Sequence, residues 1–190
     1  DYQGAINTYN NILLFDDENY DVMFKVGTIY NELGLYDKAE KFVDEAISCT
    51  IPNMKMYYQL ALIYGNQGKY MSATIAFLEA LKLSPEYMKI KYQLGVASME
   101  LQIFNTAAKY FEEYILQNQK DEIAFFLLGK CYYKIGDYPA ALLAFKQANL
   151  LSPNDHQIMY YIGKSYSSLG VESDAALIFR KALKINSEDP

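Results

Sequence analysis

The sequence predicts an all-α fold in which one pair of helices is repeated along the chain with a period of 34 residues. A small residue recurs at this spacing without insertion or deletion, at Gly27, Ala61, Gly95, Gly129 and Gly163. A large apolar residue precedes each one, at Val26, Leu60, Leu94, Leu128 and Ile162. Later in each period a small residue is followed four positions on by a large one, as in Ala141 and Phe145. Such periodicity indicates an array of stacked units.

Each element of the repeated unit has its own local signal. In the first helix, for example residues 57–66, apolar residues are spaced by three and four and therefore share one face. Glycine follows this helix at Gly34, Gly68, Gly136 and Gly170, where a left-handed residue can end it at little steric cost. Pro139 stands where the second helix begins, a position at which its fixed φ is favourable.

This pattern resembles the tetratricopeptide repeat, a helix-turn-helix unit with the motif x-L-G-x-x-Y, then A-x-x-x-F, then P. The resemblance implies a right-handed α-α superhelix, a solenoid in which each second helix packs against the first helix of the next repeat. We expect full repeats at residues 20–53, 54–87, 88–121, 122–155 and 156–190 within one continuous domain. Residues 1–19 match only the second helix of a repeat.

The repeat at residues 88–121 is degenerate. It has Ser98 where the others have tyrosine, Gln102 where the turn glycine stands, and Gln119 where proline ends other repeats. Tyr114 replaces a small residue at a helix contact, so we expect it to push the next repeat away or to turn its hydroxyl outward.

Charge and hydropathy narrow the class of partner. The net charge is −6, and residues 1–53 hold ten acidic residues against three lysines. Nucleic acid is therefore disfavoured, because phosphate binding needs a basic surface, and the acidic end is expected to be a solvated face. No apolar run approaches the roughly 18 residues of a membrane span, so we expect no direct membrane insertion.

The residues that carry enzymatic or metal chemistry do not form a recognisable set, so we expect no enzyme and no cofactor. His156 is the one histidine, and Gly163-Lys164-Ser165 lies within an expected helix and lacks the upstream glycine of a phosphate-binding loop. Cys49 and Cys131 occupy apolar positions in different repeats, which predicts buried, reduced thiols and favours a cytoplasmic location.

By resemblance, repeat positions 2, 5, 6, 9, 12 and 13 should line a concave groove. Position 5 is aromatic throughout, at Phe24, Tyr58, Tyr92, Phe126 and Tyr160. These rings could serve mainly in packing, or they could form a ladder of apolar contacts for an extended or helical peptide. Gln59 and Gln93 occupy position 6 in the second and third repeats.

The groove positions are more basic than the rest of the chain. Six lysines stand there against Asp21, Glu32 and Glu100, namely Lys25, Lys55, Lys89, Lys130, Lys134 and Lys164. The carboxylate clamp of chaperone-binding family members is not reproduced, since only Lys89 fits its pattern. We therefore expect a non-catalytic scaffold that binds a protein or peptide partner through an acidic segment with apolar anchors.

Two other functions stay open from the sequence. The chain could be an architectural subunit whose ends and convex face build a multiprotein assembly, or the substrate-recruiting arm of an enzyme whose catalytic domain lies outside it. The chain starts with a helix that matches the second helix of a repeat, and we expect no capping helix after Leu183. We therefore expect a fragment of a longer repeat protein. Its uncapped ends could also self-associate.

Overall fold

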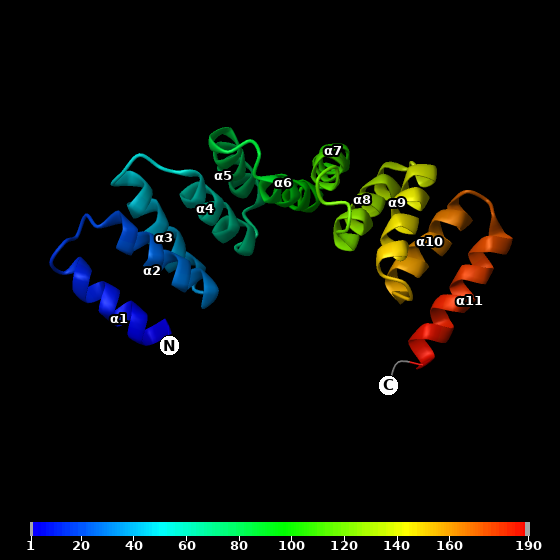
Figure 1. The fold of residues 1–190 in the computed structure, drawn as a ribbon, viewed down its shortest axis with the longest axis horizontal. Coiled ribbons are helices and arrows are strands. Elements are labelled where there is room, and N and C mark those ends of the chain that lie inside the picture. Colours follow the sequence, from blue (N-terminus) through cyan, green and yellow to red (C-terminus); the bar gives the residue numbers. More distant parts are fainter. Residues whose placement is uncertain (1, 189–190) are drawn as a thin grey trace. The chain divides into compact units, whose positions relative to one another are not determined.

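A computed structural model describes residues 2–188, and side chains for residues 2–184. Within this range the chain forms eleven α-helices and no strand (Figure 1). Their bounds are α1 Tyr2–Leu13, α2 Tyr20–Glu32, α3 Tyr36–Ser48, α4 Met54–Asn66, α5 Tyr70–Leu83, α6 Met88–Glu100, α7 Phe104–Ile115, α8 Glu122–Ile135, α9 Tyr138–Leu151, α10 His156–Ser168 and α11 Glu172–Glu188. The all-α prediction is confirmed.

The chain forms two compact units, Asp1–Ile90 and Lys91–Pro190, which are described separately. In the first unit α2 packs against α3 and α4 against α5, while α1 packs on α2 and α3 on α4. The side chains of Asn19 and Asn53 accept hydrogen bonds from the backbone N–H groups of Val22 and Met56, both at 3.2 Å, and so cap α2 and α4.

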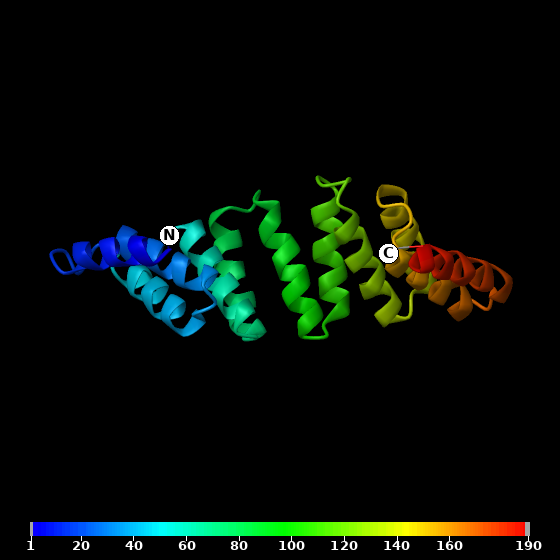
Figure 2. The same cartoon turned by 90° about the horizontal axis from the view of Figure 1, so that it is seen from below.

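In the second unit α8 pairs with α9 and α10 with α11, while α7 packs on α8 and α9 on α10. Figures 1 and 2 both show α10 and α11, orange to red, lying side by side. Asp121, Asp137 and Asp155 cap α8, α9 and α10 through their carboxylates. Pro139 lies at the N-terminal end of α9, as predicted.

The recurring small residue lies where the two helices of a pair approach most closely. A Cβ added at Gly129 would lie 2.6 Å from Cδ1 of Phe145, and one at Gly163 would lie 2.6 Å from Cε1 of Phe179. At Gly27 the added atom would lie 2.6 Å from Cγ2 of Val43. No larger residue fits these positions without displacing the partner side chain. The 34-residue signal in the sequence is therefore a packing requirement.

The predicted left-handed turn is present in all five full repeats. Gly34, Gly68, Gly136 and Gly170 have φ between 72° and 92°. Gln102 takes the same conformation in the third repeat, with φ 60°, although it carries a side chain. A non-glycine residue in this region is strained by about 1–3 kcal/mol.

Replacing Gln102 with glycine should therefore raise the free energy of unfolding by about 0.5–1 kcal/mol, since relief of strain exceeds the extra flexibility of the unfolded chain. Urea denaturation followed by circular dichroism measures the change. The matched substitution Gly136→Ala should lower the free energy of unfolding by about 1 kcal/mol. Equal stability of Gln102→Gly and the parent would show that the turn is not strained.

Tyr114 is accommodated at the end of α7 by a polar contact. Its ring lies 5.1 Å from that of Tyr92, and its hydroxyl donates a hydrogen bond to Oδ2 of Asp121 at 2.8 Å. Burial, together with this hydrogen bond, raises the pKa of Tyr114 to about 12. Oδ1 of the same carboxylate accepts from Ala124 at the start of α8. Tyr114 thus places its hydroxyl at the N-terminus of α8 and joins two successive repeats.

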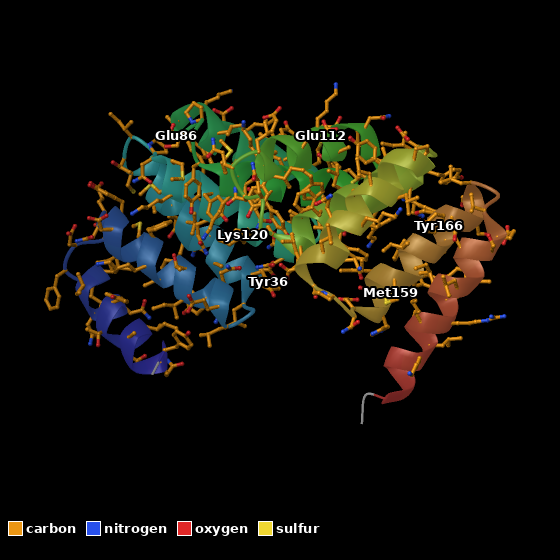
Figure 3. All side chains as sticks on the ribbon, turned by 45° about the vertical axis from the view of Figure 1, so that its right-hand side comes forward. Tyr36, Glu86, Glu112, Lys120, Met159 and Tyr166 are labelled. Carbon is orange, nitrogen blue, oxygen red and sulfur yellow. The ribbon has the colours of Figure 1, made fainter. Side chains whose placement is uncertain are left out.

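A second phenol links the same two helices. Tyr132 of α8 donates a hydrogen bond to Glu112, which projects from α7 and is labelled in Figure 3. Burial and then the hydrogen bond to Glu112 raise the pKa of Tyr132 to about 12. The irregular third repeat is therefore attached to the fourth by polar contacts as well as by its apolar core.

Asn149 is a polar residue at a position that other repeats fill with apolar side chains. Among the described residues, its side-chain oxygen Oδ1 is buried without a hydrogen-bond partner. The equivalent residues are Ile47, Leu81, Ile115 and Leu183. A buried carbonyl without a partner loses its hydration and gains nothing in return.

Asn149→Leu should accordingly raise the free energy of unfolding by about 1–2 kcal/mol, because it removes the unpaired oxygen and adds apolar contact. Thermal and urea unfolding measure this. Asn149→Ala serves as the control, since it removes the oxygen without supplying apolar volume and should be less stable than Asn149→Leu. A destabilised Asn149→Leu variant would show that the amide is satisfied in solution.

Candidate protein-binding surface

The aromatic residues at position 5 pack against the second helix of their own repeat. Ring centroids lie 5.6 Å apart for Tyr58 and Phe77, and 5.7 Å apart for Phe126 and Phe145. The same contact joins Tyr92 to Phe111 and Tyr160 to Phe179. Phe24 packs on the core of α3 and α4. The ladder therefore has a structural role, and its role in binding stays a prediction.

The predicted binding residues are divided between the two units. Phe24, Lys25, Lys55, Tyr58, Gln59 and Lys89 belong to the first, and Tyr92, Gln93, Phe126, Lys130, Lys134, Tyr160 and Lys164 to the second. In the first unit the ammonium of Lys25 lies 5.9 Å from the ring centroid of Tyr9. Lys55 and Lys89 are exposed, while Gln59 and Gln93 are half-buried. Lys55 also borders an open hollow of about 600 Å³ with Ile51 and Leu83.

In the second unit, α8 and α10 combine aromatic rings with lysines. The Lys164 ammonium lies 4.9 Å from the ring centroid of Tyr133, 5.6 Å from that of Tyr160 and 5.7 Å from that of Tyr161. The Lys130 ammonium lies 5.7 Å from the Phe126 ring. We call this surface the α8–α10 face; its residues are Phe126, Lys130, Tyr133, Lys134, Tyr160, Tyr161 and Lys164.

Within the part of the chain that the structure describes, the lysines of the α8–α10 face have no acidic partner. Among the described residues of this unit, Lys91 and Glu113 form an ion pair at 2.7 Å, whereas Lys130, Lys134 and Lys164 form none. Ring contacts favour the position of an ammonium but use none of its N–H donors in a conventional hydrogen bond. The positive charge of the face is therefore available to an external carboxylate.

Tyr133 and Tyr161 were absent from the site predicted from the sequence. Tyr133 occupies groove position 12 and Tyr161 position 6, so the repeat register contained the signal that identifies them. The Tyr133 hydroxyl and Oγ of Ser168 are 3.2 Å apart, which joins α8 to the end of α10. Together with Tyr160, these two rings surround the ammonium group of Lys164.

The first unit contains a network of polar side chains that includes carboxylates. Its contacts join structural elements to one another. Nζ of Lys69 lies 2.8 Å from Oε2 of Glu40, and Nε2 of Gln67 donates to the same oxygen and to Asp37. Burial acts to raise the pKa of Glu40, but hydrogen bonds from Lys69 and Gln67 lower it overall. Burial, followed by the charge of Glu40, raises the pKa of Asp44. The network ties α3 to the turn between α4 and α5.

No group of three or more His, Cys, Asp or Glu residues in the described part of the chain is placed to hold a metal ion. Among the same residues, none of the helices combines the length and the apolar character needed to cross a bilayer.

The two cysteines differ in environment, which corrects one expectation. Cys131 is buried in the core between α7 and α8, as predicted, and burial raises its pKa to about 12 despite the nearby charge of Lys130. The prediction that Cys49 is buried is wrong, since its side chain is exposed. Cys49 directly follows the last residue of α3, at a repeat position that lies outside the core. Its equivalents Leu83 and Leu151 are exposed as well.

Comparison with known proteins agrees with this geometry. Models of the tetratricopeptide repeat match residues 20–48, 55–87 and 123–155. The chain belongs to the tetratricopeptide repeat family. No curated protein matches it in a sequence search.

Several solved structures are similar in fold. MamA from Desulfovibrio magneticus RS-1 is 20% identical with a TM-score of 0.85, over 90% of this chain and 97% of that one. The C-terminal part of a tetratricopeptide repeat-containing protein from Cytophaga hutchinsonii is 19% identical with a TM-score of 0.86, over 98% and 74%. YrrB, described as a tetratricopeptide repeat protein with an unusual peptide-binding site, is 21% identical with a TM-score of 0.84, over 95% and 93%.

The thiols should differ in reactivity. A thiol reagent at pH 8 should label Cys49 rapidly and Cys131 only on unfolding, because Cys131 is both inaccessible and protonated. Mass spectrometry of the folded protein at successive times gives the number of modified thiols. In the Cys49→Ser variant, Cys131 is the thiol that remains to be labelled. Fast labelling of Cys131 in this variant would show that α8 is not packed against α7.

Proposed function

We propose that the protein is a non-catalytic scaffold whose α8–α10 face binds an acidic segment of a partner protein. The observation that carries this is that Lys130 and Lys164 lie beside aromatic rings and that neither they nor Lys134 is paired with a carboxylate among the described residues. A protein of net charge −6 concentrates positive charge here, so the face differs from the bulk of the molecule.

The arrangement favours a ligand that alternates carboxylates with apolar side chains. Carboxylates supply the acceptors that the lysine N–H groups lack, and the contact is charge-assisted. Apolar side chains can pack on Tyr160, which is 48% exposed, and on Ile123, which is 53% exposed. YrrB, of similar fold, is described as having a peptide-binding site, which supports a peptide as the class of ligand.

The test uses two fluorescent peptides. In the first, glutamate alternates with leucine and phenylalanine; in the second, each glutamate is replaced by lysine. Only the acidic peptide should bind the parent protein in fluorescence anisotropy. Lys130→Glu, Lys134→Glu and Lys164→Glu together should weaken its binding at least tenfold, since attraction becomes repulsion. Binding to the parent should also weaken as salt rises, because charges are screened beyond about 10 Å at 0.1 M.

The matched control is Lys109→Glu, Lys120→Glu and Lys181→Glu, which changes net charge equally at exposed lysines outside the face. This control should bind the acidic peptide within about twofold of the parent, because distant exposed charges are screened. Circular dichroism checks that each variant is folded. Equal weakening by both triple variants would show a general charge effect and would contradict the proposed site.

An architectural role is the second candidate, and a different surface favours it. Helix α5 has apolar side chains on its outer face, including Met71 at 60% and Ile75 at 58% exposure. Ile75 and Leu78 border a hollow of about 300 Å³ beside the Glu79–Lys82 ion pair. Exposed apolar stripes of this kind are typical of helix docking. This role is favoured if Ile75→Asp disrupts an assembly that the native protein forms, while the variant with Lys130→Glu, Lys134→Glu and Lys164→Glu still forms it.

A further inference from the structure

The loop between α1 and α2 exposes apolar and acidic side chains together (blue in Figure 1). Leu14 is 80% exposed and Phe15 is 93% exposed, and the exposed carboxylates of Asp16, Asp17 and Glu18 follow them directly. None of these three carboxylates forms an ion pair with another described residue. We call residues 14–18 the acidic loop.

The apolar exposure belongs to the repeat position, whereas the acidity belongs to this loop. The apolar residues that later repeats place at the positions of Leu14 and Phe15 are exposed as well, namely Leu83, Leu116, Leu150 and Leu151. In the four later loops, the positions of the three carboxylates hold a single acidic residue, Glu86. Stacking of the repeats therefore does not require the acidic side chains, and they lie beside apolar surface that is unfavourable in water.

Local hydrogen bonds restrict the backbone of the acidic loop. The backbone N–H groups of Phe15 and Asp16 both donate to the carbonyl oxygen of Ile12 at 3.0 Å. Nδ2 of Asn19 donates to Oδ2 of Asp16 at 2.8 Å. These contacts lower the ordering cost that the loop would meet on docking to a partner.

We infer that the α8–α10 face binds the acidic loop of a second copy of this chain. The inference rests on the function proposed above, because it names the partner of the same face. The loop supplies carboxylates for the three lysines of the face, which have no ion pair among the described residues, and apolar side chains for its half-buried rings Tyr133 and Tyr161. Opposite charge on two surfaces of one acidic chain favours this contact over contact between two like surfaces.

The contact is heterologous, since the acidic loop lies in the first unit and the α8–α10 face in the second. A copy whose face is occupied still offers its loop, so association adds further copies head to tail. A variant that has lost one of the two surfaces can make a single contact through the other.

Sedimentation velocity at increasing concentration tests this pairing. The loop variant carries Phe15→Ala, Asp17→Asn and Glu18→Gln, and it keeps Asp16, which accepts the hydrogen bond from Asn19. The face variant is the triple glutamate variant of the three lysines. The parent should sediment faster as its concentration rises from low to high micromolar, whereas each variant alone should sediment as a monomer. An equimolar mixture of the two variants should form a species of two chains and none larger, because one intact loop meets one intact face.

The matched control for the loop variant is Ile51→Ala with Glu86→Gln and Asp174→Asn. It alters one exposed apolar side chain and two exposed carboxylates elsewhere, so net charge changes equally. This control should associate as the parent does, and circular dichroism verifies that each variant is folded. A monomeric parent, equal association of the parent and the loop variant, equal loss in the control, or a mixture without the two-chain species would each overturn the inference.

Peptides separate this inference from the proposed function. A fluorescent peptide of residues 11–20 should bind the parent in anisotropy, and the same peptide with the three substitutions of the loop variant should bind at least tenfold more weakly. If the alternating glutamate peptide binds the face and the peptide of residues 11–20 does not, the second copy is excluded as the partner and the proposed function stands. If neither peptide binds, both fail.

Discussion

The close approach of the two helices in each repeat is the constraint on which the other features depend. A Cβ at Gly27, Gly129 or Gly163 would lie 2.6 Å from the large side chain opposite, which is shorter than van der Waals contact allows. The small residue therefore fixes how deeply a phenylalanine or valine enters between the helices. Each pair thereby gains a buried core, and its remaining apolar surface packs on the neighbouring helix.

This constraint also decides what the aromatic ladder does. Phe145 lies against Gly129, and Phe126 of α8 packs on the same ring with centroids 5.7 Å apart. The same relation holds for Tyr160 and Phe179 beside Gly163. Rings that complete the core cannot all turn toward a ligand as well. The function that we propose for the second unit therefore rests on the lysines beside the rings, Lys130 and Lys164, as well as on the exposed part of Tyr160.

The repeat period made most of the fold predictable, because it reports contacts that recur: the small residue at Gly129, the turn at Gly136 and the cap of α9 at Asp137. What the period could not predict depends on single substitutions and helix ends. Gln102 keeps the left-handed turn without glycine, because the flanking helices over-determine it. Cys49 is exposed because its repeat position lies outside the core, as the exposed equivalents Leu83 and Leu151 also show. The rings around Lys164 come from groove positions of two repeats, so the register identifies the positions but not that they meet at one lysine.

Lys164 combines a packing contact with the recognition role that we propose for it. Three tyrosine rings within 5.7 Å favour its ammonium through their negative faces, at about 0.5–1 kcal/mol per contact at an exposed site. The rings hold the side chain in one place, which lowers the entropy that a ligand must still remove. They also leave the N–H donors without carboxylate acceptors, so the favourable ring contact and an incoming carboxylate do not compete. Contacts that restrict a lysine side chain before binding lower the ordering cost that reduces affinity at most surface lysines.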